Sequence, residues 1–225
     1  MTVIPGGARK LHSPVSVGSE SVSAIYDDAG SDTVFLCAHG AGGNMADKSM
    51  SATAKAFVDA GVSIVRFNFL YKEKKSGRPD AMPKLIDTFS AVVARVRDDL
   101  KPKKLVIGGR SMGGRAASMM AAEGFDANGL LLLAYPLHPA GQPEKLRVAH
   151  LPSISMPVLA FSGTRDSLCS RSLMEDALKT VRTTWDMRWV ESADHSFHVL
   201  KSSGKTDAQV MQEIAAASRA WVDTL

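Results

Sequence analysis

The sequence has little cysteine, few aromatic residues and no long apolar run, and each shortage excludes a class of protein. Only Cys37 and Cys169 occur among 225 residues, which excludes a disulfide framework and favours a reducing cytoplasm. No apolar run approaches the ~18 residues that a membrane span needs, and residues 1–10 lack the apolar centre of a secretory signal. We therefore expect a cytoplasmic protein that does not contact a membrane.

Positive charge is spread along the chain and is not gathered in one region. The formal net charge is +4, and aromatic residues make up 6% of the sequence. The basic clusters at 72–75 and 101–104 are short and contain no interleaved aromatic residues, as is typical of solvated loops, so no nucleic-acid partner is expected. With 45% hydrophobic residues, the chain can bury one substantial core, and we expect a single domain over residues 1–225.

Short apolar segments alternate with helical patterns along the chain. Strands are expected at 34–38, 62–67, 105–107, 129–134, 158–161 and 187–190. Helices are expected at 48–60, 83–100, from 111 onward, at 172–180 and at 207–222. This alternation predicts an α/β protein with a mostly parallel central sheet and helices on both faces. Weak alternation over residues 14–27 predicts an antiparallel hairpin at the edge.

A nucleophile elbow is the most specific motif in the sequence. Residues 109–113 read Gly-Arg-Ser-Met-Gly, directly after the apolar segment 105–107 and before small residues that begin a helix. A strand, a tight glycine-rich turn and a helix are the context that a strained nucleophilic serine requires. We therefore predict that Ser111 is a nucleophile and that the backbone N–H of Met112, at the helix start, stabilises an oxyanion.

A serine nucleophile needs a histidine base and a carboxylate that orients the base. Asp166 follows the expected strand 158–161, and His195 follows the expected strand 187–190. Both therefore lie at the edge of the sheet where open α/β proteins place their sites. The chain order of serine, aspartate and histidine matches the order of one large hydrolase class and differs from two protease orders.

Two neighbouring residues compete for these roles. Asp194 precedes His195 directly, and adjacent side chains in a loop tend to point apart, so Asp194 is expected to form a turn. His198 is the rival base, but its apolar neighbours suggest a packed position. The loop after the strand 129–134 has no carboxylate before Glu144, which leaves Asp166 as the predicted acid.

The second oxyanion donor is expected in the loop after the strand 34–38. Residues 39–44 read His-Gly-Ala-Gly-Gly-Asn, and Gly40 and Gly42 would let the backbone approach a bound ester. We predict that the N–H of Ala41, or less readily that of Gly42, is the donor. His39 is expected to shape this loop. A phosphate loop is excluded because the Lys-Ser/Thr ending is absent.

The rim of the site is expected to be open. Arg110 and Arg115 flank the elbow and could bind an anionic substrate, although surface roles fit these arginines equally well. The segment 137–156 is short and contains three prolines, so it can form at most a short helix at 144–148 and no cap domain. The loop 70–82 is the other candidate rim.

Six segments of the chain together resemble a known family. They are His-Gly-Ala-Gly-Gly at 39–43, Arg-Phe-Asn-Phe at 66–69, Gly-Arg-Ser-Met-Gly-Gly at 109–114, Tyr-Pro-Leu-His-Pro at 135–139, Gly-Thr-Arg-Asp at 163–166 and Asp-His-Ser-Phe at 194–197. The chain resembles the α/β-hydrolases, in particular the dienelactone-hydrolase-like group and the small hydrolases related to testis-expressed protein 30 and a chromatin-complex subunit. One departure is Leu70, where the resemblance leads us to expect proline.

This resemblance implies an α/β-hydrolase fold with little or no cap. From the residues and the resemblance together we predict a carboxylesterase-like serine hydrolase that cleaves a small acyl ester through an acyl-enzyme. The reaction requires no metal and no cofactor. The alternative to an enzyme is a non-catalytic interaction module with the same fold. Among enzymes, a thioesterase or a peptidase would use the same three side chains.

Overall fold

The computed structural model describes residues 8–11 and 14–225. Residues 1–7, which form most of the segment searched for a secretory signal, lie outside the described part of the chain. No helix in the described part is both long and apolar enough to cross a bilayer.

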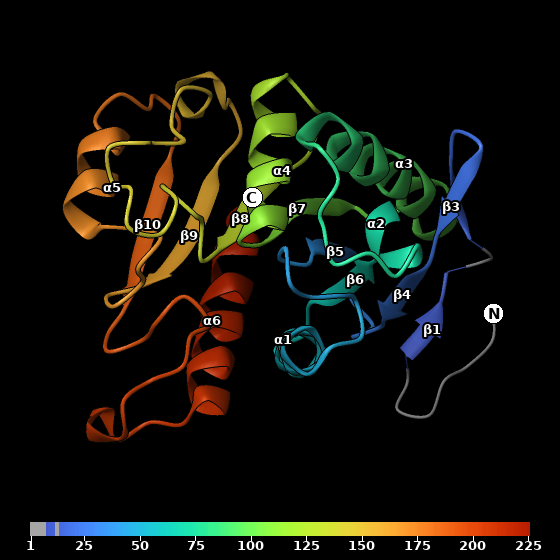
Figure 1. Cartoon of the computed structure of the whole chain (residues 1–225). Coiled ribbons are helices and arrows are strands. Elements are labelled where there is room, and N and C mark those ends of the chain that lie inside the picture. The colour runs from blue at the N-terminus through green and yellow to red at the C-terminus, as the bar shows by residue number, and fades with distance from the viewer. Residues whose placement is uncertain (1–7, 12–13) are drawn as a thin grey trace.

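The centre of the molecule is an eight-stranded sheet in the order β1-β4-β6-β5-β7-β8-β9-β10 (Figure 1). Its strands are β1 (Ala8–Lys10), β4 (Ala24–Asp27), β5 (Thr33–Ala38), β6 (Ser63–Phe67), β7 (Lys104–Arg110), β8 (Gly129–Leu133), β9 (Val158–Gly163) and β10 (Trp185–Val190). The strands from β6 to β10 run parallel, whereas β4 and β1 pair antiparallel at one edge. The mostly parallel sheet predicted from the sequence is confirmed.

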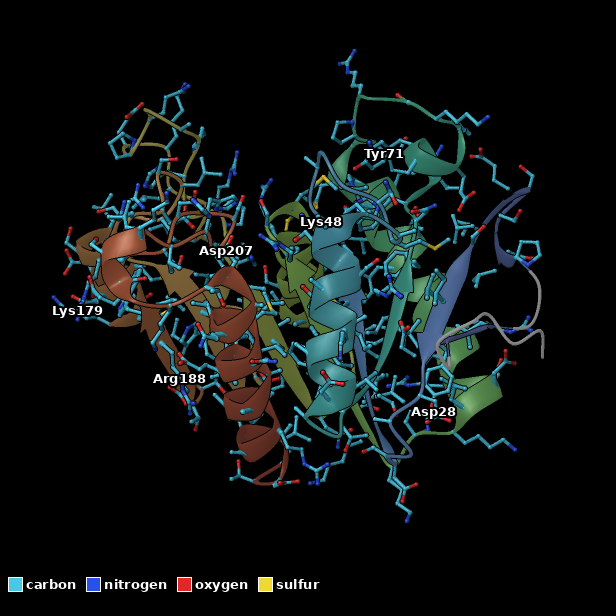
Figure 2. The ribbon with its side chains drawn as sticks, turned by 90° about the horizontal axis from the view of Figure 1, so that it is seen from below. Asp28, Lys48, Tyr71, Lys179, Arg188 and Asp207 are labelled. Atoms are coloured by element: carbon cyan, nitrogen blue, oxygen red, sulfur yellow. The ribbon has the colours of Figure 1, made fainter. Side chains whose placement is uncertain are left out.

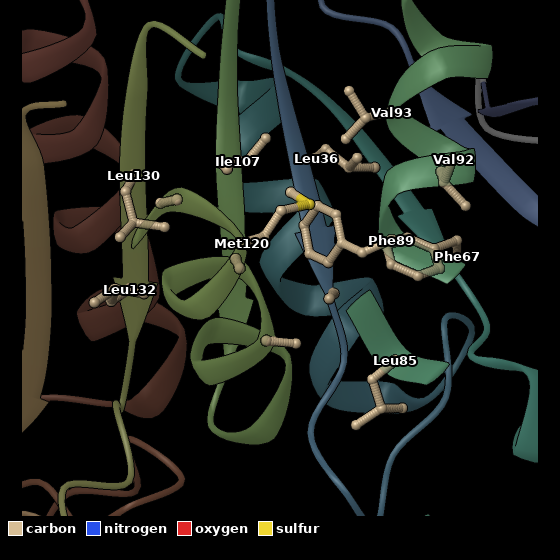
Figure 3. Close-up of a cluster of buried hydrophobic side chains, with 14 of the residues drawn as sticks. Leu36, Phe67, Leu85, Phe89, Val92, Val93, Ile107, Met120, Leu130 and Leu132 are labelled. Atoms are coloured by element: carbon tan, nitrogen blue, oxygen red, sulfur yellow. The ribbon is translucent and has the colours of Figure 1, made fainter. Parts of the chain in front are cut away.

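Helices cover both faces of this sheet (Figure 1). One face packs against α3 (Met82–Leu100), α4 (Met112–Ala122) and α5 (Arg171–Leu178), and the other packs against α1 (Lys48–Asp59) and α6 (Asp207–Val222). Successive strand residues divide between the two cores: Leu36 contacts the α3 side, and its neighbours Phe35 and Cys37 contact the α1 side. Figure 3 shows the α3 side, where Phe89 and Met120 meet the strand side chains.

Three local features differ from the sequence-based expectation. The segment 14–27 divides in two: β2 (Val15–Val17) and β3 (Glu20–Val22) form a separate two-stranded sheet, and β4 joins the main sheet. A four-residue helix, α2 (Leu70–Glu73), begins the rim loop. The helix considered at 144–148 does not form: the N–H of Arg147 donates to the carbonyl oxygen of Leu137 at 2.8 Å, which is not a helical partner. A 3-10 turn occurs later, at η1 (Leu151–Ser153). A second 3-10 turn, η2 (Lys201–Ser203), precedes α6.

The neighbouring strands β5 and β7 create a crevice at their carboxyl ends. They pair side by side, but β5 leads to α1 on one face whereas β7 leads to α4 on the other. Loops that diverge in this way open a space at the sheet edge, which is where α/β proteins bind their ligands. The glycine-rich loop 39–43 and Ser111 both lie at this crevice.

Candidate active site

Ser111 lies in a strained turn between β7 and α4. Its backbone angles are φ 47° and ψ −114°, and its N–H donates to the carbonyl oxygen of Leu133 at 3.0 Å. The turn is tight enough that a Cβ on Gly109 would lie 2.3 Å from the carbonyl oxygen of Ala38, and one on Gly113 would lie 2.6 Å from it. Only glycine fits these two positions, so the backbone holds the serine in a conformation that most residues avoid.

The side chains of Ser111, His195 and Asp166 form a continuous chain of hydrogen bonds. Ser111 Oγ lies 2.9 Å from His195 Nε2, and His195 Nδ1 lies 2.9 and 2.8 Å from the two carboxylate oxygens of Asp166. Because the carboxylate can only accept, Nδ1 carries the hydrogen, which leaves Nε2 with a lone pair directed at the serine hydroxyl. The three residues come from the ends of β7, β9 and β10.

The Asp166 carboxyl group is held in one orientation by its hydrogen-bond donors. Its side chain is fully buried, and it accepts hydrogen bonds from Ser162 Oγ at 3.2 Å and from the N–H of Leu168 at 2.8 Å, besides that from His195. A buried carboxylate with several donors is compensated for its loss of water. The carboxylate orientation is therefore fixed before any substrate arrives.

Asp194 and His198, the rivals of Asp166 and His195, do not take part in this chain of hydrogen bonds. Asp194 Oδ1 accepts from the N–H groups of Ser196 and His198 at 2.7 and 3.0 Å, which is the turn role expected for it. The packed position expected for His198 is wrong: its side chain is 66% exposed and pairs with Asp207 at 2.9 Å. Phe197 and Val199 on either side are buried, so His198 points in the opposite direction, toward solvent.

The glycine-rich loop 39–43 passes next to the nucleophile. A Cβ on Gly40 would lie 3.5 Å from Ser111 Cβ, so the absence of a side chain there lets the loop approach the serine. The N–H groups of Ala41 and Met112 have no acceptor among the described residues, and Met112 is the first residue of α4, whose N–H cannot bond within the helix. Gly42 is exposed, as Ala41 is, and its N–H also has no acceptor among the described residues, so it stays the alternative donor.

The buried side chain of His39 connects this loop to the segment that follows β6. It is fully buried, its Nδ1 lies 2.7 Å from the carbonyl oxygen of Gly40, and its Nε2 accepts from the N–H of Phe69 at 3.3 Å. Nδ1 therefore carries the hydrogen. Burial lowers the pKa of His39, which keeps the ring neutral as this pattern requires. His39 thus has the loop-shaping role expected for it.

The segment 66–71 braces the same loop, and sequence reasoning missed this role. Tyr71 Oη donates to the carbonyl oxygen of Ala41 at 2.8 Å, and Asn68 Oδ1 accepts from the N–H of Met45 at 2.9 Å. Buried Arg66 contacts the Met45 carbonyl as well. Figure 2 places Tyr71 at the end of the molecule where α1 begins at Lys48. From the sequence, the segment 66–69 contributes only to the resemblance. Its polar residues at the end of a strand are the feature that could have predicted a contact with the neighbouring loop.

The departure at Leu70 does not disturb this bracing segment. Leu70 is the first residue of α2 and is buried. The N–H at the first position of a helix has no partner within the helix, so leucine and proline both fit there. Leucine at this position is therefore compatible with the shape of the loop.

The two arginines that flank the elbow have different surroundings. Arg110 Nη1 contacts Ser49 Oγ, Arg110 Nη2 donates to the carbonyl oxygen of His195 at 3.4 Å, and the guanidinium lies 5.5 Å from the ring of Phe197. Arg110 is thus engaged by the protein itself, and the substrate-binding role considered for it is disfavoured. The side chain of Arg115 makes no hydrogen bond or ion pair with any described residue.

The segment between β8 and β9 forms a low wall and no cap. It folds back on itself through the hydrogen bond from Tyr135 Oη to the carbonyl oxygen of Arg147, at 2.6 Å. It is fastened to α4 by His150 Nε2, which lies 2.8 Å from Ser118 Oγ. His195 remains 25% exposed, so the edge of the site is open to solvent.

The two thiols and the metal-binding residues offer no second reactive centre in the described chain. Cys37 and Cys169 are buried, and burial raises the pKa of each thiol to about 12, so both remain neutral. Within residues 8–11 and 14–225, no group of three or more histidine, cysteine, aspartate or glutamate side chains is arranged to hold a metal ion.

A groove of about 650 Å³ runs from the base loop, which is residues 194–198 around His195, between α1 and α6. Arg110, Ser196 and Phe197 lie at the end next to His195, and Ala52 and Met211 belong to its walls. Figure 2 shows the two helices side by side, with Lys48 and Asp207 at their beginnings. The groove therefore opens at the same edge of the sheet as Ser111.

Comparison with known proteins places this geometry in context. The family model of the alpha/beta hydrolase domain matches residues 31–223. A dienelactone hydrolase from Anabaena variabilis has a similar structure, with 21% identity and a TM-score of 0.74 over 96% of this chain and 97% of that one. A serine hydrolase from Xanthomonas campestris that is described as lacking a lid has 22% identity and a TM-score of 0.72, over 98% of both chains.

An alpha-beta serine hydrolase homologue from Coxiella burnetii is also similar, with 19% identity and a TM-score of 0.74 over 97% of this chain and 99% of that one. At these identities the three structures share the fold with this chain.

Proposed function

The chain belongs to the alpha/beta hydrolase family, and from this we propose that it is a serine hydrolase that cleaves small acyl esters through an acyl-enzyme. The observation that carries the proposal is the hydrogen-bonded series of Ser111, His195 and Asp166 beside a free oxyanion loop. A purely structural set of buried polar residues would not need a strained serine with two unpaired N–H groups beside it.

In the proposed acylation step, His195 Nε2 removes the hydroxyl proton of Ser111 while Oγ forms a bond to the ester carbonyl carbon. The tetrahedral intermediate then collapses, the bond to the alcohol oxygen breaks, and His195 returns the proton to the departing alcohol. A water molecule repeats the sequence on the acyl-enzyme and releases the acid. Asp166 stabilises the cationic form of His195 in both halves of the reaction.

The N–H groups of Met112 and Ala41 are the proposed oxyanion donors. One comes from the start of α4, directly after Ser111, and the other comes from the loop that Tyr71 and His39 brace. Pre-positioned donors of this kind are each worth roughly 3 kcal/mol in the transition state. The bracing contacts support the proposal because an oxyanion site must be rigid before the charge develops.

The open rim supports a small substrate. Neither the segment 134–157 nor the loop 70–82 contains a helix long enough to form a roof.

Thioesters and activated amides contain the same acyl carbonyl as esters. A substrate series that includes all three classes will rank them by kcat/KM.

A fluorophosphonate probe tests the proposal directly. An activated Ser111 displaces fluoride from the probe, so the intact mass of the protein should increase by one adduct that maps to Ser111. We expect Ser111→Ala to abolish labelling and His195→Ala to slow it by orders of magnitude. Ser196→Ala is the matched control, because Ser196 is an exposed serine next to the base and should leave labelling unchanged.

The proposal fails if folded wild-type protein stays unlabelled while a control esterase reacts. It also fails if labelling maps to a serine other than Ser111. Circular dichroism of each variant separates a loss of reactivity from a loss of fold.

A further inference from the structure

Arg115 carries a positive charge beside the nucleophile that the protein itself does not pair. Its Nε is buried and has no hydrogen-bond partner, and no described carboxylate lies within ion-pair distance of its guanidinium. Arg171, Arg188 and Arg219 on the outer surface differ in this respect, since each pairs with a carboxylate. A buried donor left without a partner is costly, which makes this position unusual for a folded protein.

The backbone places Arg115 one helical turn beyond Ser111. Its N–H donates to the carbonyl oxygen of Ser111 at 2.9 Å, so the two Cα atoms are ~6 Å apart. Side chains of a helix lean toward its N-terminus, and in α4 this direction leads back to the edge that holds Ser111. The guanidinium of Arg115 therefore lies on the side of the helix that a bound ester would reach.

The face of α4 that presents Arg115 looks onto the segment between β8 and β9. Ser118 is three residues further along this face, and its Oγ lies 2.8 Å from His150 Nε2. Arg147, from the same segment, is fixed by its N–H bond to the carbonyl oxygen of Leu137 at 2.8 Å. Arg115, which is half-buried, thus lies between α4 and a wall that carries a second guanidinium.

The local charge is positive and uncompensated. Arg147 makes no ion pair with any described carboxylate, and its Nη1 has only the carbonyl oxygen of Pro136 at 3.4 Å. Burial and the charge of Arg115 lower the pKa of Arg147, and the same two causes lower that of His150 to about 4. His150 is therefore neutral at pH 7, and two guanidinium groups share this corner of the site without an anion.

We propose that Arg115, assisted by Arg147, binds a carboxylate carried by the substrate, so that the preferred esters are short and anionic. A carboxylate is planar and accepts two parallel hydrogen bonds from one guanidinium edge, and the Nη groups of Arg115 make no hydrogen bond or ion pair with any described residue. The short distance from Ser111 limits the carboxylate to a position a few bonds from the scissile carbonyl. This inference rests on the proposed function of the same site.

Matched pairs of esters test the inference in the full-length protein. One pair is p-nitrophenyl hemisuccinate and the neutral p-nitrophenyl butyrate, and a second pair, 4-acetoxybenzoate and phenyl acetate, places the carboxylate in the leaving alcohol. We expect the wild type to prefer the anionic ester of at least one pair by tenfold or more in kcat/KM. Arg115→Gln should remove this preference, and Arg147→Gln should reduce it.

The ratio of kcat/KM within a pair is the readout, because it cancels losses that come from partial unfolding. Arg182→Gln is the matched control: Arg182 is an exposed arginine just before β10, at the opposite end of the sheet, and its removal should leave the ratio unchanged. Hydrolysis of the neutral esters with no anionic preference, or a preference that survives Arg115→Gln, would overturn the inference and leave the proposed function intact. Failure of the proposed function differs, because the wild type would then cleave none of the four esters.

Discussion

The guanidinium of Arg110 donates to the carbonyl oxygen of His195 at 3.4 Å, so the residue directly before Ser111 holds the backbone of the histidine that Ser111 contacts. The same guanidinium contacts Ser49 Oγ on α1 and lies over the ring of Phe197. The base loop includes a strained residue, since Phe197 has φ 61°, and such a conformation persists only where the surroundings enforce it. Arg110 is one of the enforcing contacts.

Loss of Arg110 should therefore impair catalysis through the position of His195. We expect Arg110→Gln to lower kcat by about tenfold to a hundredfold with a smaller change in KM, because small misplacements of a base are costly. Arg110→Lys keeps the charge without the planar fork and should recover part of the loss. Steady-state kinetics and the rate of fluorophosphonate labelling check this. A change confined to KM would instead assign Arg110 to substrate binding.

Asp166 and Asp194 should differ sharply when each is neutralised. Asp166→Asn removes the acceptor that fixes the tautomer of His195, so we expect kcat to fall by orders of magnitude, with ~10⁴ as the reference for a catalytic-triad acid. Asp194→Asn alters a turn and should cost less than about tenfold. Measuring kcat for both variants shows which aspartate orients His195. A larger loss for Asp194→Asn than for Asp166→Asn would assign this role to Asp194.

Esters with long acyl chains should have a lower kcat/KM than esters with short ones. Each buried methylene contributes up to ~0.8 kcal/mol, but this gain requires walls that enclose the chain. The segment 134–157 and the loop 70–82 enclose few carbons, so kcat/KM for neutral p-nitrophenyl esters should be highest from acetate to butyrate and decline thereafter. Interfacial activation should be absent. Preference for laurate or palmitate esters would show that a long apolar tunnel exists.

His150 should make the protein less stable in mild acid. Burial and Arg115 hold the pKa of His150 at about 4, against an ordinary value of 6.5. The unfolded chain then binds more protons between these values, so the free energy of unfolding rises with pH across this window and falls as the pH drops through it. One such group can contribute at most ~1.4 kcal/mol per pH unit, and less here because the ring is partly solvated.

Denaturant titrations of the wild type and His150→Gln between pH 4 and 7 measure this contribution, and the variant should have the shallower slope. His198→Gln is an informative comparison. The hydrogen bond to Asp207 raises the pKa of His198, so its contribution is present below 6.5 and is lost as the pH rises through the folded value. Equal slopes for the wild type and His150→Gln would contradict the expected coupling.

The sheet and its helices were predictable from the sequence because their determinants are local. The apolar residues of strands β5, β7 and β8 are consecutive, which indicates strands that are buried on both faces. Gly109 and Gly113 on either side of Ser111 identify the elbow from the local sequence. The placement of Asp166 and His195 after strand ends followed from the parallel arrangement. These predictions required no knowledge of which side chains touch across the fold.

Other parts of the site depend on contacts between distant segments. Nothing local distinguishes Arg110 from Arg115, yet one reaches α1 and the base loop while the other remains unpaired. Tyr71 meets Ala41 across 30 positions of the sequence, a contact that periodicity does not reveal. The exposure of His198 was open to prediction, since alternation places it opposite to its buried neighbours Phe197 and Val199.

The pairing of Ser111 with His195 spans 84 positions of the chain, and this separation has a consequence during synthesis. A ribosome adding about 5 to 20 residues per second makes the serine roughly 4 to 17 s before the histidine. At the start of that interval β5, β6 and β7 can already pair, whereas β8, β9 and β10 are added as it proceeds, and α6, which packs against α1, is made only after His195. The nascent chain thus carries Ser111 before His195 exists, and the hydrogen bond between the two residues can form only after β10 has joined the sheet.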